Sequence, residues 1–176
     1  AVTDRAWVGK QTLCEQVEAA LKGGCTCVQL REKELSDAEF LEEAVKIHEI
    51  CKHYGVPFIV NDNVDIAVKC HAEGIRERVG DDMIIGVSAH TVEEAVEAVK
   101  NGADYLGAGA VFGSSTKQNA GAMKKETLRS ICEAVDIPVV AIGGINGKNL
   151  KELSHTGIDG VALVSAIFAA DDIENT

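Results

Sequence analysis

Polar and charged residues follow several short apolar runs of this sequence, and their spacing is typical of phosphate binding. Gln29, Arg31 and Lys33 alternate along one such run, so in a pleated strand their side chains would share one face. Arginine offers a planar fork of donors and lysine a point charge, and both suit phosphate oxygens. We expect these residues to clamp a pyrophosphate. Solvated charges at a strand end are the alternative.

A second polar pair, Asn61 and Asp62, closes the apolar run that begins at Phe58. A carboxylate near a pyrophosphate suits Mg²⁺, which usually takes one or two carboxylates together with phosphate oxygens. We therefore expect Asp62 to hold Mg²⁺, with a turn-stabilising aspartate as the alternative. Asn63 is expected only to cap the next helix.

Hydroxyl groups and glycines follow the later runs. The segment 113–117 carries hydroxyls and a cation within a long loop, which we expect to bind anions and to close over them. Gly143 and Gly144 follow one run and Ser165 follows another at a helix start, where free N–H groups favour phosphate.

Ser88 ends a further run, and His90 beyond it is interpreted as an ordinary loop residue. The pattern predicts two anion sites, one around Arg31, Lys33 and Lys117, the other around Gly144 and Ser165.

The runs themselves are predicted to be parallel strands, because they are apolar nearly throughout, as strands covered on both faces must be. The predicted strands are 25–30, 58–61, 84–88, 105–108, 139–142 and 161–164, with a stub at Val2 and a fragment at Gly74 and Ile75. Eight strands in strict alternation with helices favour a closed TIM-type (β/α)₈ barrel over an open α/β sheet. Active sites of such barrels lie at the C-terminal strand ends, where the polar residues stand.

Two of the intervening helices have predicted starts. Ser36-x-x-Glu39 is typical of a capping box that opens a helix over 37–53, and Thr91-x-x-Glu94 of one that opens a helix ending at Asn101. The 3.6-residue period of the first helix predicts one apolar face, formed by Phe40, Leu41, Ala44, Val45, Ile47 and Cys51.

Length and composition limit the class of protein. A chain of 176 residues, 46% of them hydrophobic, can bury one sizeable core, so we expect a single domain over residues 1–176. The absence of an apolar run of about 18 residues and of a signal-peptide pattern favours a cytoplasmic protein without a membrane span. The net charge of -11 argues against nucleic acid. The six cysteines lack zinc-ligand spacing and are expected to be reduced core residues.

Two places suggest that residues are missing from the sequence. It begins within what is predicted to be the first strand, at residues 1–3, and Ile75 is followed at once by residues 76–79, which resemble the last turn of a helix. A strand normally has about 5 residues and the loop after it several more. We therefore expect a truncated first strand and a fourth strand-end loop that is missing from the sequence, with a protein that has lost this loop as the alternative.

Taken in order, these motifs resemble the thiamin-phosphate synthase family over nearly the whole chain. The matching segments are 28–33, 61–62, 86–88, 114–117, 141–145 and 164–167. The resemblance implies a transferase that joins hydroxymethylpyrimidine pyrophosphate to thiazole phosphate with Mg²⁺, forming thiamin phosphate and releasing pyrophosphate. Pyrophosphate would leave first, by a dissociative displacement that needs no protein nucleophile. A homo-oligomer is compatible with the sequence.

The resemblance also implies the roles of individual residues. Pyrimidine pyrophosphate would be bound by Gln29, Leu30, Arg31, Glu32, Lys33, Asn61, Ser88 and Lys117, with Arg31, Lys33, Ser88 and Lys117 acting in catalysis. Thiazole phosphate would be bound by Ser114, Ser115, Thr116, Gly144, Val164 and Ser165, and Mg²⁺ by Asp62. The family has Gly-Gln-x-Asp after the fourth strand, whose aspartate is a second Mg²⁺ ligand, and nothing between Ile75 and Arg76 matches it. Ser114 stands where the family usually has threonine.

Two other functions are compatible with the fold. A related thiazole tautomerase would act by proton transfer, and His90 would be the first residue to test as its acid or base. A non-catalytic sensor of phosphate esters would bind thiazole phosphate without Mg²⁺-dependent turnover. Gln29, Asp62 and Lys117 favour the synthase, because a tautomerase has no pyrophosphate to clamp.

Overall fold

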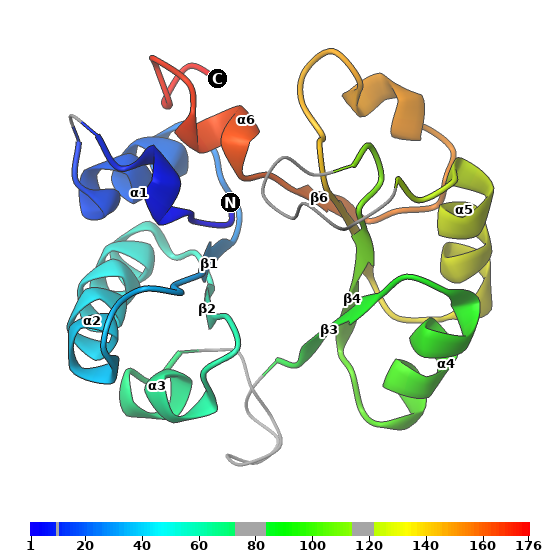
Figure 1. The fold of residues 1–176 in the computed structure, drawn as a ribbon, viewed down its shortest axis with the longest axis horizontal. Helices are drawn as coiled ribbons and strands as arrows, with labels where there is room; N and C mark the ends of the chain where they lie inside the picture. Colours follow the sequence, from blue (N-terminus) through cyan, green and yellow to red (C-terminus); the bar gives the residue numbers. More distant parts are fainter. Residues whose placement is uncertain (10, 73–83, 114–121) are drawn as a thin grey trace. The chain divides into compact units, whose positions relative to one another are not determined.

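The computed structural model describes residues 1–9, 11–72, 84–113 and 122–176, which fall into two compact units. Unit 1 comprises Ala1–Met83 and Ile167–Thr176, and unit 2 comprises Ile84–Ala166 (Figure 1). Each unit has its own hydrophobic core.

Unit 1 is built on a small parallel sheet. Strands β1 (Val28–Leu30) and β2 (Phe58–Val60) pair in parallel, and Val2 forms a parallel bridge to Gln29. The bridge confirms the strand stub predicted at Val2. In Figure 1 the helices lie on one side of these strands: η1 (Arg5–Trp7), α1 (Leu13–Lys22), α2 (Asp37–Tyr54) and α3 (Val64–Lys69).

Helix α2 buries one face in the core of unit 1. Phe40, Ala44, Ile47 and Cys51 are buried, as the period predicts, but Val45 is 44% exposed, so the apolar face predicted to include Val45 is not buried at that position. His48 is buried instead: its ring stacks on Phe58 at 5.4 Å between ring centroids, and its Nδ1 lies 2.8 Å from the carbonyl oxygen of Cys70. At 100° per residue His48 lies closer to the buried stripe than Val45 does, and its polarity concealed this position.

The predicted helix starts are confirmed with one correction. Ser36 and Glu39 form the reciprocal capping box of α2. At α4 (Val92–Lys100) Thr91 accepts the hydrogen bond from the Glu94 N–H, but the Glu94 carboxylate accepts from the backbone of His90. The second box is therefore only half formed, because the Glu94 side chain reaches one residue further back.

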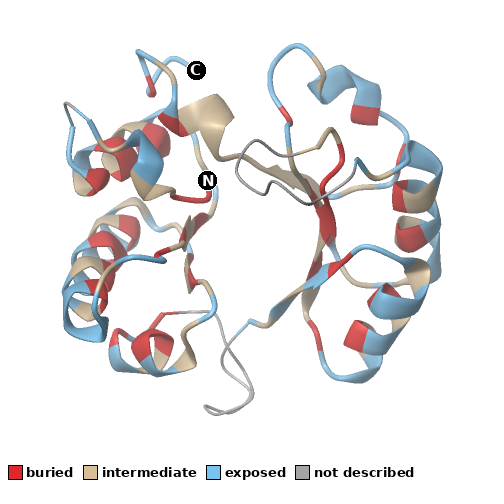
Figure 2. Ribbon diagram, in the orientation of Figure 1, coloured by how far each residue is buried: buried red, intermediate tan, exposed pale blue. Residues whose placement is uncertain are grey.

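Unit 2 is built on a four-stranded parallel sheet. The order is β3-β4-β5-β6, with β3 (Gly86–Ala89), β4 (Tyr105–Gly109), β5 (Val139–Ile142) and β6 (Gly160–Ala162). Helices α4 and α5 (Lys125–Ala134) cover one face, and buried positions gather on β4 and β5 and on the sides of these helices that face the sheet (Figure 2). The connection from β5 to β6 contains only η2 (Leu150–Leu153), and α6 (Ser165–Phe168) follows β6.

The observed strands confirm most of the predicted ones. The strand at 139–142 has the predicted bounds, whereas β1 starts three residues later than predicted and β6 ends at Ala162 rather than at residue 164. The fragment at Gly74 and Ile75 lies outside the described residues. Consecutive strands that pair in parallel and alternate with helices are the pattern of a TIM-type α/β fold. That residues 1–176 form a single domain stays a prediction.

Two expectations about the whole chain bear on its class. Within the described ranges, no helix combines the length and apolar character that crossing a membrane requires. The six cysteines all lie in the described residues and no disulfide joins them, and burial raises the pKa of the Cys14 and Cys132 thiols. Cys51 and Cys70 are buried in the core of unit 1, as expected, whereas Cys14, Cys25, Cys27 and Cys132 are half-buried rather than core residues.

Candidate functional site

The segment from Gln29 to Lys33 leaves the C-terminal end of β1 with its side chains alternating in exposure. Leu30 and Glu32 are buried, Gln29 and Arg31 are half-buried, and Lys33 is exposed. Since Leu30 faces the core, the residues on either side of it face away from it. Arg31 and Lys33 are thus more exposed than Leu30 and Glu32, and a common direction of their side chains stays a prediction.

Glu32 lies between the two cations but has structural partners of its own. Its Oε1 accepts hydrogen bonds from the N–H groups of Lys33, at 2.7 Å, and Glu34, at 2.9 Å, and its Oε2 lies 2.7 Å from Nε of Arg5. Burial raises the pKa of Glu32, but the hydrogen bonds from Glu34, Arg5 and Lys33 outweigh it and leave the pKa below its ordinary value. Glu32 is therefore an ionised anchor of this turn.

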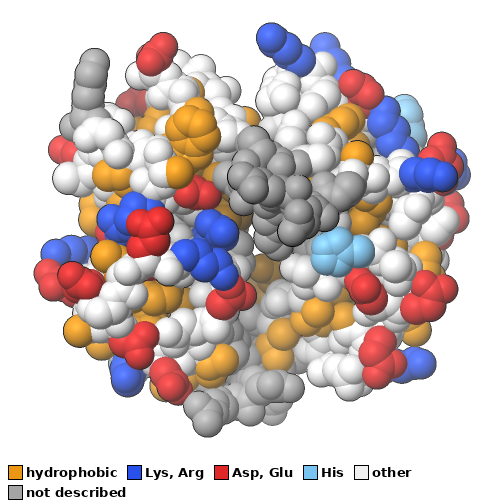
Figure 3. All heavy atoms as spheres, in the orientation of Figure 1, with side chains coloured by type: hydrophobic (Ala, Val, Ile, Leu, Met, Phe, Trp, Pro, Cys, Tyr) orange, Lys and Arg blue, Asp and Glu red, His pale blue; other side chains and the backbone are white. Residues whose placement is uncertain are grey.

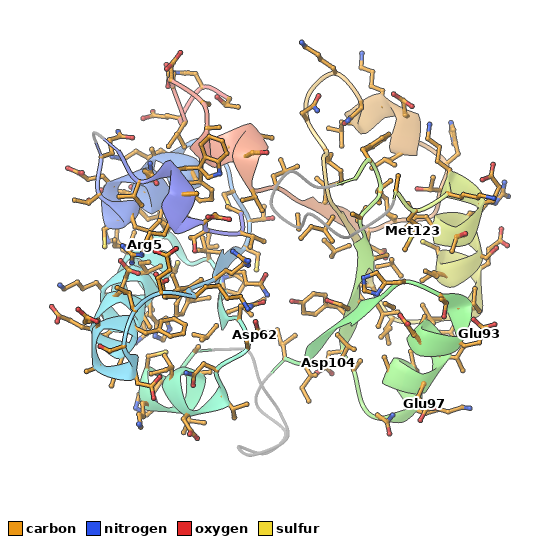
Figure 4. All side chains as sticks on the ribbon, viewed as in Figure 1. Arg5, Asp62, Glu93, Glu97, Asp104 and Met123 are labelled. Atoms are coloured by element: carbon orange, nitrogen blue, oxygen red, sulfur yellow. The ribbon has the colours of Figure 1, made fainter. Side chains whose placement is uncertain are left out.

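Both cations of the segment contact carboxylates within unit 1. Nη1 of Arg31 lies 3.3 Å from Oδ2 of Asp4, and Nζ of Lys33 lies 2.7 Å from Oδ2 of Asp62. Arg5 and Asp62 are labelled in Figure 4. On the face drawn in Figure 3, Lys and Arg side chains lie next to Asp and Glu side chains. The structure thus brings Lys33 and Asp62 together, as expected for residues at neighbouring strand ends.

Asp62 occupies the turn after β2. The N–H of Asn61 donates to the carbonyl of Leu30, at 2.9 Å, which continues the pairing of the two strands to their ends. Asp62 itself has a φ of 63°, in the left-handed region, and its side chain is 66% exposed. The hydrogen bond from Lys33 lowers the pKa of Asp62 below its ordinary value, so the carboxylate is ionised at neutral pH. Asn63 caps α3 through the N–H of Ile66, which confirms its predicted role.

Unit 2 carries the glycines predicted to bind phosphate. Gly144 follows β5 with a φ of 64°, and a Cβ there would lie 2.8 Å from the carbonyl oxygen of Gly113. The side-chain amides of Asn146 and Asn149 donate to the Gly144 carbonyl, at 3.2 and 2.9 Å. The backbone of this turn is therefore held from several sides.

The other predicted residues of unit 2 occupy strand ends. Ser88 is exposed on β3, opposite Gly107 of β4. Val164 and Ser165 are half-buried after β6, and Ser165 is the first residue of α6, as predicted. Ser114, Ser115, Thr116 and Lys117 lie outside the described residues, as does the site of the missing loop between Ile75 and Arg76.

His90 is tied to the helix that follows it. Its backbone N–H donates to Oε2 of Glu94 at 2.7 Å, and its Nδ1 lies 3.3 Å from the same oxygen. These contacts make His90 part of the start of α4, in agreement with its interpretation as a loop residue.

One group of residues near the cations was missed. Thr3, Asp4 and Arg5 contact the backbone of Arg31, its guanidinium and the Glu32 carboxylate, respectively. These three residues directly follow the strand stub at Val2. The residues after the other predicted strands were considered as site residues, and the same rule applied to this stub would have identified these three.

Comparison with known proteins assigns the chain. The family described as thiamine monophosphate synthase matches residues 1–167. This chain belongs to that family. The thiamine-phosphate synthase of Clostridium acetobutylicum is 46% identical over 99% of this chain and 88% of its own length. The one from Ruminiclostridium cellulolyticum is 47% identical over 99% and 89%. The resemblance inferred from the motifs is confirmed.

Solved structures agree with this assignment to the thiamine monophosphate synthase family. The thiamine phosphate pyrophosphorylase from Pyrococcus furiosus has a TM-score of 0.87 and 39% identity, covering 98% of this chain and 88% of its own. The geranylgeranylglyceryl phosphate synthase from Thermoplasma acidophilum, at a TM-score of 0.73 and 14% identity, shows the fold alone. The TIM-type α/β class is thereby confirmed. The chain is an enzyme, a transferase of thiamine biosynthesis with thiamine-phosphate synthase activity.

Proposed function

We propose that this enzyme joins hydroxymethylpyrimidine pyrophosphate to thiazole phosphate by a dissociative displacement. The bond from the pyrimidine methylene carbon to the pyrophosphate oxygen breaks, and the electron pair leaves with pyrophosphate. The thiazole nitrogen then donates its lone pair to the carbon cation, which gives thiamin phosphate. No proton transfer and no protein nucleophile are needed, so positioning and charge stabilisation supply the catalysis.

The observation that carries this proposal is the arrangement at the ends of β1 and β2. After β1, Arg31 is half-buried and Lys33 is exposed, and Asp62 after β2 lies 2.7 Å from the Lys33 ammonium. Positive groups held in place where a pyrophosphate departs would stabilise the charge that develops on it. This arrangement supports roles for Arg31 and Lys33 in holding the leaving group.

The donor set at Asp62 fits Mg²⁺. In the described part of the chain no three His, Cys, Asp or Glu side chains gather as a metal site, but Mg²⁺ needs only one or two carboxylates when phosphate supplies further oxygens. Asp62 is exposed and ionised, so its oxygens are accessible. When bound, the metal would neutralise charge on the pyrophosphate. Asp62 would hold it, and Lys33 would then be released to contact phosphate.

The remaining roles follow the family resemblance. Gln29, Asn61, Ser88 and Lys117 would complete the contacts to pyrimidine pyrophosphate. The side chains of Leu30 and Glu32 are buried, so we expect neither to contact the substrate directly, and the Glu32 carboxylate would support the turn through its hydrogen bonds. The thiazole phosphate would be bound by Ser114, Ser115, Thr116, Gly144, Val164 and Ser165. We place the enzyme in the cytoplasm. We expect no nucleic-acid partner, because the net charge of -11 repels polyanions. A homo-oligomer stays a prediction.

The decisive experiment mixes the purified protein with both substrates and Mg²⁺ and follows thiamin phosphate and pyrophosphate together. Equal amounts of both products are expected, with loss of activity in EDTA and in Asp62→Asn. Asp136→Asn, an exposed aspartate before β5, is the matched control and should retain activity. Binding of thiazole phosphate without any product would contradict the proposal.

Neither alternative is supported by the comparisons, since the family description and the relatives named above carry the synthase name. The tautomerase hypothesis would be tested by His90→Gln, which should leave synthase activity largely intact. The sensor hypothesis would require binding without turnover in the assay above.

A further inference from the structure

Three consecutive residues after the strand stub at Val2 each contact the segment that carries the two cations. The hydroxyl of Thr3 accepts a hydrogen bond from the N–H of Arg31 at 3.0 Å, and Thr3 is completely buried. Asp4 contacts the Arg31 guanidinium at 3.3 Å. Arg5 contacts the Glu32 carboxylate at 2.7 Å. The backbone and side chains of the segment are thus fixed from one neighbouring chain segment.

Arg5 joins this segment to the rest of unit 1. Its Nη2 lies 2.6 Å from Oε2 of Glu43 on α2, while its Nε binds Glu32. The Glu32 side chain is only 2% exposed, and its other oxygen holds the N–H groups of Lys33 and Glu34. A planar guanidinium can bridge two carboxylates in this way, whereas a lysine ammonium is a single point charge. The conformation of the turn at Lys33 therefore depends on Arg5 through Glu32.

Asp4 acts on the Arg31 side chain rather than on the backbone of the segment. Its side chain is 13% exposed and that of Arg31 is 25% exposed, so their contact is partly shielded from solvent. The other Asp4 oxygen accepts from the N–H of Ala6 at 3.0 Å, which fixes the carboxylate at the start of η1. Asp4 therefore restricts the directions in which the Arg31 guanidinium can point.

From these contacts we propose that Thr3, Asp4 and Arg5 are positioning residues for the pyrophosphate-binding segment, and that Arg5 acts through the Glu32 carboxylate. This inference rests on the proposed function, because it assigns the pyrophosphate of the pyrimidine substrate to Arg31 and Lys33. Groups that orient the ligands of a metal typically cost about 10- to 100-fold in affinity or activity when mutated, and we expect a loss of similar size for groups that orient Arg31 and Lys33. The effect should be confined to the substrate that carries pyrophosphate.

The test compares Arg5→Gln and Arg5→Lys with wild type in the full enzyme, with each substrate varied in turn. We expect Arg5→Gln to raise the KM for pyrimidine pyrophosphate about tenfold or more and to leave the KM for thiazole phosphate within about twofold. Arg5→Lys should recover part of the loss. Arg129→Gln, which breaks an exposed 2.8 Å ion pair with Glu133, is the matched control and should change neither KM.

A second pair of variants decides the matter if Arg5→Gln does not fold. Thr3→Val replaces the hydroxyl by a methyl group of similar size, and Thr3→Ser keeps the hydroxyl. Thr3→Val should raise the KM for pyrimidine pyrophosphate selectively, and Thr3→Ser should not. Equal rises in both KM values, or none in a folded variant, would overturn the proposal.

Direct binding separates this inference from the proposed reaction. If wild type forms no thiamin phosphate, the proposed reaction fails. Calorimetry with inorganic pyrophosphate and Mg²⁺ then still measures how tightly the segment with Arg31 and Lys33 binds pyrophosphate. Weaker pyrophosphate binding by Thr3→Val than by Thr3→Ser would then support positioning, and equal binding would refute it. If wild type is active and the variants show unchanged KM values, only the positioning inference fails.

Discussion

Lys33 and Asp62 neutralise each other at the end of the first two full strands of unit 1. Their side chains are 53% and 66% exposed, with 2.7 Å between ammonium nitrogen and carboxylate oxygen. Exposed ion pairs contribute about 0–1 kcal/mol, so a ligand can separate this one at little cost. A bound metal ion would replace Lys33 as the partner of Asp62. A phosphate group would replace Asp62 as the partner of Lys33.

The exchange of partners predicts opposite effects in one variant. Lys33→Gln removes the cation that competes for Asp62, so Mn²⁺ as a probe should bind the protein several-fold more tightly, while pyrophosphate should bind more weakly. Calorimetric titrations with each ligand alone measure both changes. Lys46→Gln breaks a similarly exposed 2.6 Å pair with Glu42 and serves as the control. An unchanged Mn²⁺ affinity in Lys33→Gln would show that the pair does not restrict the metal.

Gly144 allows a second prediction at the scale of the residue. The backbone of Gly144 has a left-handed φ of 64°, and a Cβ added at this position would lie 2.8 Å from the Gly113 carbonyl oxygen. Gly144→Ala should therefore lower the free energy of unfolding by about 1–3 kcal/mol and weaken thiazole phosphate binding. Gly147→Ala, in the same connection, meets nothing within 4 Å and should be nearly neutral. Urea unfolding and equilibrium binding of thiazole phosphate would check both variants, and similar losses in the two would count against this assignment.

At the scale of the elements, local sequence signals predicted what local forces determine. The capping box at Ser36 and the strand over 139–142 depend on neighbouring residues and were predicted correctly. His48 was missed because its burial depends on Phe58 and on the carbonyl of Cys70, 22 residues away. The contacts of Thr3 and Arg5 with the β1 end span 28 and 27 residues, and only the fold brings these residues together.

The turn after β1 has a predictable response to acid. The folded-state pKa of Glu32 is lowered, so its contribution to stability is present above the unfolded pKa of about 4.3 and is lost as pH falls through the lower folded value. The free energy of unfolding should therefore decrease below about pH 4.5, and Glu32→Gln should decrease less over that range. Urea unfolding from pH 7 to pH 3 measures this difference. The control is Glu133→Gln on the surface of α5, and an equal acid response in wild type and Glu32→Gln would contradict the assignment.

At the scale of the whole molecule, the regular alternation of strands and helices predicted the fold class, and the similarity to solved synthases confirmed it. The sequence also differs from its relatives inside the matched region. Curated relatives align with it over 184 to 189 residues, more than its 176, so the alignments contain positions that have no counterpart in this sequence. The short connection at Ile75 and Arg76 is the place where the sequence predicts this difference.

This difference predicts a gain on insertion. A loop from a relative that contains the Gly-Gln-x-Asp motif, placed between Ile75 and Arg76, should lower the Mg²⁺ concentration for half-maximal activity about tenfold, because it adds a carboxylate ligand. An insertion of equal length made of glycine and serine is the control. Steady-state rates over a Mg²⁺ series measure the effect, and equal improvement by both insertions would indicate a purely steric role.

The paired charges at the β1 and β2 ends also determine how the enzyme responds to ionic strength. Salt screens exposed charges over a Debye length of about 8–10 Å at physiological concentrations. It would therefore weaken the attraction between Lys33 and pyrophosphate, and at the same time weaken the Lys33–Asp62 contact that must open before binding. These two effects oppose one another, so affinity for the pyrophosphate substrate should vary less with salt than it would in a site of unpaired cations.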